Sequence, residues 1–138
     1  MVEGEVHEFS YIPGDLWTVS PLGIHHVPGL FARNERLTTF IKTDKGECVL
    51  VKVGATVVGR IRVCYHDLVS NRSGAKNQQV VLKTPFHVNR GEELGLFELG
   101  STVICLFPPG QIELGKLQVE QKICLGQAVG RFCLGSND

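Results

Sequence analysis

Glycine and proline divide this chain into short segments, and this division limits the fold more than any other feature of the sequence. Sixteen of the 138 residues are glycine and six are proline. The segments between them are rich in β-branched and aromatic residues, which favour strands. No segment shows the periodicity of a long amphipathic helix. We therefore predict a mainly β fold with little helix, a compact domain of the β-barrel or sandwich type.

The pattern of residues also places individual elements. Residues 37–43 and 48–53 are expected to pair as a hairpin around a turn at 44–47. Residues 20–31 contain two prolines and should be irregular, with one short helical turn. The remaining expectations are strands at 56–63, 79–83 (ended by Pro85) and 118–123, a polar loop at 66–78, a turn at 89–92 and a barrel-closing turn and strand at 126–130.

Composition limits the class of protein. A chain of this length, 43% hydrophobic, can form one domain with a core but not two ordinary domains. The formal net charge is zero, so nothing indicates a nucleic-acid partner. There is no 18-residue apolar run that would span a membrane. The five cysteines lack CxxC spacing and are odd in number, which favours buried thiols over disulfides or a metal site.

The most unusual segment is 97–107, where two apolar runs meet at Gly100-Ser101. Glycine allows backbone angles that other residues adopt only at a cost. If the bond is strained, the Ser101 hydroxyl can attack the Gly100 carbonyl carbon and move the acyl group from nitrogen to oxygen. Elimination from the resulting ester breaks the chain and leaves a dehydroalanine, which hydrolyses to a pyruvoyl group. Such a group can do Schiff-base chemistry.

Several motifs in this chain resemble those of the phosphatidylserine decarboxylase family. The segment Gly91–Thr102 reads GEELGLFELGST and is similar to the family's LGST maturation site. The resemblance continues upstream and covers nearly the whole chain, through the segments 13–16 (PGDL), 30–36 (LFARNER) and 53–59 (VGATVVG).

This resemblance implies a phosphatidylserine decarboxylase-like catalytic domain over 1–138, truncated at its N-terminal side. Cleavage between Gly100 and Ser101 would give a long β chain, 1–100, and a short α chain, 101–138, which stay together as a heterodimer. Ser101 would become the covalent pyruvoyl cofactor that forms the Schiff base with substrate. Phe97, Leu99 and Thr102 belong to the cleavage motif, and no metal is expected.

The resemblance also implies the reaction and its location. The amine of phosphatidylserine would condense with the pyruvoyl carbonyl, CO2 would leave, and phosphatidylethanolamine would be released, a step of phospholipid biosynthesis. The enzyme would be peripheral at a phospholipid membrane surface, on the cytoplasmic face of a bacterial inner membrane or at the mitochondrial inner membrane.

Proton transfer is the incomplete part of this interpretation. The family carries an Asp and a pair of His on an N-terminal segment, which would fall before Met1, so we expect this chain alone to be inactive. Among the local histidines, His87 is the candidate proton donor because it precedes the cleavage strand. Ordinary structural roles are expected for Asp15 in a turn, for Glu35 in an ion pair with Arg36, and for the exposed lysines 42, 45, 52 and 76.

The alternative is a protein without catalysis. The chain would then be an inactive fragment or degenerate copy that acts as a lipid-binding or partner-binding β module. A biotinyl or lipoyl carrier domain is disfavoured, because Lys45 lacks the flanking residues that such a domain needs.

Overall fold

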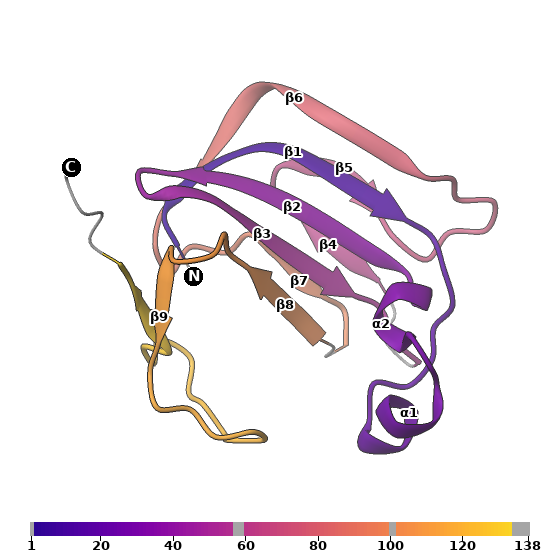
Figure 1. Cartoon of the computed structure of the whole chain (residues 1–138). Helices are drawn as coiled ribbons and strands as arrows, with labels where there is room; N and C mark the ends of the chain where they lie inside the picture. Colours follow the sequence, from indigo (N-terminus) through magenta and orange to yellow (C-terminus); the bar gives the residue numbers. More distant parts are fainter. Residues whose placement is uncertain (1, 57–59, 100–101, 134–138) are drawn as a thin grey trace.

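The computed structural model describes residues 2–56, 60–99 and 102–133, and Figure 1 shows a curved β domain with an arm near its C-terminal end. The prediction of a mainly β fold with little helix is confirmed. The described elements are β1 (Gly4–Ile12), α1 (Pro21–His26), α2 (Leu30–Arg33), β2 (Arg36–Thr43), β3 (Gly46–Val53), β4 (Ile61–Val63), β5 (His66–Val69), β6 (Gln78–Val88), β7 (Gly95–Phe97), β8 (Thr102–Leu106), β9 (Ile112–Leu114) and β10 (Gly130–Phe132).

A five-stranded antiparallel sheet in the order β6-β1-β2-β3-β8 dominates the molecule. The predicted hairpin is its centre, with Thr43 opposite Gly46 at the turn and Arg36 opposite Val53 at the other end. Buried and partly exposed residues alternate along β2, as the period of a strand requires. One face of the sheet therefore covers the core.

The core lies between this sheet and a second, three-stranded sheet in the order β5-β4-β7. Phe9 and Leu37 of the large sheet pack with Ile61, Val63 and Leu68 of the small one. Both sheets are open in the described part of the chain, so the compact β domain is built from packed sheets with free edges. A third pair, β9 and β10, forms a separate two-stranded ribbon.

Some boundaries differ from the sequence expectations. Residues 118–123 are not a strand, and residues 66–69 of the expected loop form β5. Only 61–63 of the expected strand 56–63 is described as strand, and 57–59 lie outside the described residues. The strand 79–83 continues through Pro85 as part of β6.

Pro85 is tolerated because of its position. β6 is an edge strand, and its register with β1 jumps between Val81 and Phe86, so Pro85 falls in a stretch without ladder partners. Proline lacks a backbone N–H and is accommodated at such edges and bulges.

The buried-thiol prediction was right for one cysteine. Cys48 is buried in the core, whereas Cys64, Cys105 and Cys124 are exposed and Cys133 is partly exposed. Instead of one helical turn, the segment 20–31 contributes two short helices. No helix of the described chain is long and apolar enough to cross a membrane.

Truncating Phe9 should test the core. Its side chain is fully buried, with ring centroids 5.6 Å from Tyr65 and 4.7 Å from His66. We expect Phe9→Ala to lower the free energy of unfolding by about 3–5 kcal/mol, measured by urea denaturation, because it leaves a cavity. The control is Phe40→Ala, on the opposite and partly exposed face of β2, which should cost clearly less. Equal losses would contradict this assignment of the core.

Candidate functional site

The predicted cleavage bond, Gly100–Ser101, lies outside the described residues, but the residues before and after it are described. β7 ends at Phe97, and the Glu98 N–H donates a hydrogen bond to the Arg60 carbonyl oxygen at 2.9 Å. β8 begins at Thr102, which is opposite Val53 in β3. The link from 98 to 101 therefore connects the small sheet to the large one.

The small-sheet end of this link is also fixed by charge. The Arg62 guanidinium donates to the Glu98 carboxylate, with its Nε and Nη2 at 2.9 and 2.8 Å from Oε1. Leu99, the next residue, is 54% exposed.

Segments of three motifs meet next to Val53, through the side chain of Asn34. Asn34 is fully buried, and its Nδ2 donates to the carbonyl oxygens of Trp17 at 2.7 Å and of Gly54 at 2.9 Å. Its Oδ1 accepts from the Trp17 N–H at 3.0 Å. One carboxamide thus joins the chain just after PGDL to the LFARNER and VGATVVG segments, beside the strand position that pairs with Thr102.

Glu35 is a second buried connection, and its expected ion pair with Arg36 was wrong. The carboxylate Oε1 accepts hydrogen bonds from the Tyr11 hydroxyl at 2.5 Å and from the Asn71 N–H at 2.6 Å. Its main chain accepts from the Gly54 N–H at 2.7 Å. Arg36 instead donates to carbonyl oxygens of the preceding helix and turn. Burial and the Glu35 contact both raise the pKa of Tyr11, so its hydroxyl stays protonated.

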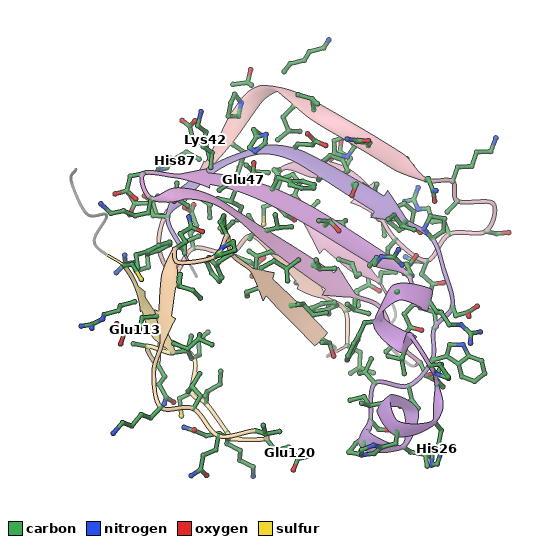
Figure 2. The ribbon with its side chains drawn as sticks, viewed as in Figure 1. His26, Lys42, Glu47, His87, Glu113 and Glu120 are labelled. Carbon is green, nitrogen blue, oxygen red and sulfur yellow. The ribbon has the colours of Figure 1, made fainter. Side chains whose placement is uncertain are left out.

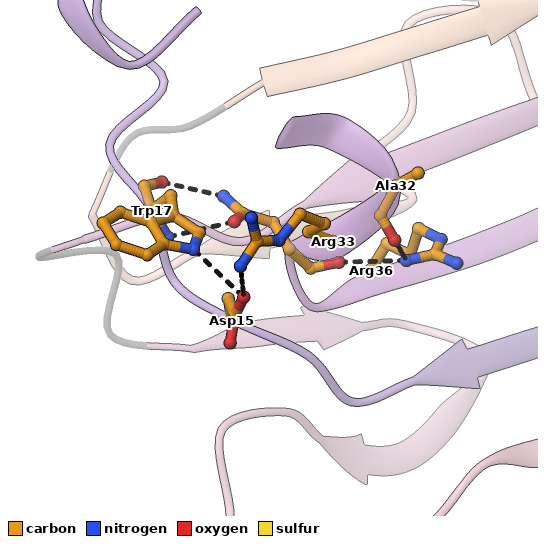
Figure 3. Close-up of polar contacts among 6 residues, drawn as sticks. Asp15, Trp17, Ala32, Arg33 and Arg36 are labelled. Carbon is orange, nitrogen blue, oxygen red and sulfur yellow. Dashed lines mark hydrogen bonds and ion pairs between the residues drawn. The ribbon is translucent and has the colours of Figure 1, made fainter. Parts of the chain in front are cut away.

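Asp15 is more than a turn residue. Its Oδ2 accepts from the Trp17 indole Nε1 at 3.0 Å and from Arg33 Nη2 at 3.1 Å, as Figure 3 shows. The backbone of this turn lies against the LFARNER segment so closely that a Cβ on Gly14 would be 2.3 Å from the Arg33 carbonyl oxygen. Only glycine fits there, which explains the glycine of the PGDL motif in steric terms.

Lys52 was expected on a solvated face, but it is only 5% exposed. It lies opposite Val103, two positions after Ser101 in the sequence. Its Nζ is 3.4 Å from Thr39 Oγ1, which is 2.6 Å from the Tyr65 hydroxyl oxygen. Burial lowers the pKa of Lys52 to about 8. The core face of the large sheet therefore carries an amine that is partly neutral near physiological pH.

His87 lies at the other end of the large sheet. It is opposite Glu5, which is opposite Lys42 beside the β2–β3 turn, and Figure 2 shows His87 near Lys42 and Glu47. Glu47 and Val53 are six positions apart along β3, about 20 Å at the usual rise of a strand. The fold does not bring His87 to the Thr102 end, and its role as proton donor gains no support from this arrangement.

A cavity of about 690 Å³ opens at this far end, lined by His87, Lys42, Arg90 and other charged residues. No residue flanking the predicted cleavage bond lines it. Within the described ranges there is also no group of three or more His, Cys, Asp or Glu side chains that could hold a metal ion. The residues that converge near Thr102 are instead amides, a carboxylate and a buried amine.

Comparison with known proteins shows which family this chain is similar to. A family model described as phosphatidylserine decarboxylase matches residues 1–131. The phosphatidylserine decarboxylase proenzyme of Anaeromyxobacter sp. (strain K) is 44% identical over an alignment of 130 residues, and the match covers 92% of this chain and 46% of the relative. The proenzyme of Brevibacillus brevis is 43% identical over 93% of this chain and 46% of its own length. The chain thus spans less than half the length of these curated relatives.

Replacing Asn34 should test the buried connection. Asn34→Ala leaves the Gly54 carbonyl and both backbone groups of Trp17 without this partner, so we expect unfolding to become easier by about 2–4 kcal/mol. Asn34→Asp should be at least as harmful at pH 7, because a carboxylate would face two carbonyl oxygens. Urea denaturation measures both, with exposed Asn77→Ala as the control. A loss in Asn34→Ala no larger than in this control would refute the connection.

The buried amine gives a pH prediction. Between about pH 8 and the usual lysine value of 10.5, the unfolded chain binds a proton at Lys52 that the folded chain does not. The contribution of Lys52 to stability therefore rises with pH in this window. The free energy of unfolding of the wild type, compared with Lys52→Met, should be lowest near pH 7 and recover by pH 10. Exposed Lys76→Met should show no such trend. A pH-independent difference for Lys52→Met would mean that the folded protein keeps this amine charged.

Proposed function

Because this chain belongs to the phosphatidylserine decarboxylase family, we propose that it forms the part of such an enzyme that carries the self-cleavage site and, after cleavage, the pyruvoyl group derived from Ser101. The chain spans less than half of its relatives' length, so the activity is proposed for a protein in which the rest of the family's sequence is also present. The substrate class follows from the family, a phospholipid with a serine head group at a membrane surface.

One observation carries this proposal. Four motif segments that are far apart in the sequence converge on the β3–β8 end of the large sheet, and the LGST segment is one of them. A surface loop would not need buried support of this kind, whereas a bond that must be held for attack by a neighbouring hydroxyl does need it. The residues on both sides of the Gly100–Ser101 bond are anchored in different sheets, which is compatible with a strained link.

The chain's own residues would have three roles. Asn34 and Glu35 hold the backbone of Gly54, next to the strand position that pairs with Thr102, and act as positioning residues. Lys52 places an amine on the core face opposite Val103. Ser101 supplies the attacking hydroxyl and, after elimination and loss of ammonia, the carbonyl. A pyruvoyl group supplies an electrophile that accepts electrons when a carboxylate leaves an attached amino acid.

Mass spectrometry of a chimera tests the proposal. This chain replaces the matched region of the Anaeromyxobacter relative, and intact mass is measured under denaturing conditions. We expect two polypeptides divided between Gly100 and Ser101, the second lighter by one ammonia than a chain with an N-terminal serine. The chain alone should stay uncut, because it lacks the segment to which the family resemblance assigns the base.

Two variants separate the mechanism from ordinary proteolysis. Ser101→Ala should leave the chimera in one piece, whereas Ser101→Cys keeps a nucleophile on Cβ and should retain some cleavage. Cleavage of the alanine variant at the same bond would exclude the acyl shift. A chimera that folds, remains uncut and releases no CO2 from phosphatidylserine would favour the alternative, a non-catalytic β module.

A further inference from the structure

Residues 113–131, called here the C-terminal arm, are exposed throughout. Figure 1 shows this segment extending from β9 away from the large sheet and the small sheet, and Figure 2 shows Glu113 and Glu120 along it. The arm nevertheless carries large apolar side chains that are 38–107% exposed: Leu114, Leu117, Val119, Ile123, Leu125 and Val129. Single exposed apolar residues are ordinary, but six on one short segment indicate an interaction surface.

The arm has a defined conformation. Phe132, just after it, stacks edge-on against Phe107 with ring centroids 6.1 Å apart, and Arg131 forms an ion pair with Glu113 at 2.7 Å. Between these points, two turns close by hydrogen bonds, from the Gln121 N–H to the Gln118 carbonyl and from the Gln127 N–H to the Cys124 carbonyl. The apolar side chains are therefore presented on an ordered backbone.

We propose that the C-terminal arm is the docking surface for a polypeptide partner. This partner corresponds to the region of the curated relatives that lies outside the part matched by this chain. The relatives are more than twice as long as the matched segment, so the family contains enough further chain to cover this surface. Strand β8, which precedes the arm in the sequence, is at an edge of the large sheet in the described chain and exposes Val103 and Leu106, so it offers unpaired backbone groups and further apolar area.

A protein partner suits the arm better than a bilayer does. Lys116, Glu120 and Lys122 alternate with the apolar residues, and burial in lipid would have to desolvate them. Residues 115–129 also form no helix or strand, so inserting them into hydrocarbon would leave backbone groups without partners. A polypeptide can satisfy both the charges and the backbone.

Cys124 provides a reporter inside the arm, because it is a free, exposed thiol. The chain alone and the chimera with the Anaeromyxobacter relative are treated with N-ethylmaleimide, and labelling of each cysteine is followed by mass spectrometry of peptides. Buried Cys48 must stay protected in both proteins, which shows that the β domain is folded. We expect Cys124 to react about tenfold more slowly in the chimera.

Matched variants show whether the apolar residues are responsible. In the chimera, Val119→Ser with Leu125→Ser should restore the labelling rate of Cys124 toward that of the chain alone. Val81→Ser, at a position on β6 that is 68% exposed, should leave Cys124 protected. The inference rests on family membership, and its readout is the reactivity of the Cys124 thiol rather than cleavage. A chimera that does not cleave itself can therefore still confirm the docking surface.

Three results would overturn the inference. The first is equal reactivity of Cys124 in the chimera and in the chain alone. The second is protection in the chain alone that grows with protein concentration, which would mean that a second copy covers the arm. The third is protection of the chain alone by vesicles of phosphatidylserine and phosphatidylcholine with none in the chimera, which would make the arm a lipid-binding element.

Discussion

The end of the large sheet that leads to the Gly100–Ser101 link depends on one buried carboxamide, that of Asn34. Its two donor contacts and one acceptor contact join Trp17 and Gly54, whose segments also meet where the Thr56 hydroxyl donates to the Leu16 carbonyl oxygen. Three hydrogen bonds made by a fully buried side chain fix both distance and direction. An apolar residue of the same size would fill the space but would leave three backbone groups without this partner, a loss comparable to that expected for Asn34→Ala. This satisfied network defines a single backbone position for Gly54, directly after Val53, the partner of Thr102.

Local patterns predicted the parts of the fold that depend on neighbours in sequence. The hairpin of β2 and β3 has alternating strands and a short turn, and both are visible within the stretch from Arg36 to Val53. The prediction that Pro85 ends a strand failed because proline is harmful only where its missing N–H is needed, and that depends on a partner strand far away in sequence. Similarly, the local pattern of 118–123 is that of a strand. The segment is not one because no strand of the described chain pairs with it, and the local sequence does not show this.

The candidate site shows the same contrast between features set by neighbours in sequence and features set by distant partners. The motif segments that contain Asn34 and Glu35 could be recognised in the sequence. The roles of these two residues could not, because their side chains bond to residues 17–36 positions away. Lys52 looked like a solvent-facing lysine in an alternating strand. A signal did exist, since Cys48, Leu50 and Lys52 share one face of β3 and the first two are apolar. A lysine on that face lies in the core, and burial there lowers its pKa.

The topology also explains why a cut at Gly100–Ser101 need not separate the two pieces. The portion from 102 onward enters the large sheet at once, with five residues of β8 opposite five residues of β3. These ladder contacts are independent of the covalent link, so the short chain would remain bound through backbone hydrogen bonds. The ribbon of β9 and β10 and the C-terminal arm belong to the same portion. A partner that covers the arm would therefore hold the short chain from its other end, in addition to the β3–β8 ladder and without any covalent connection.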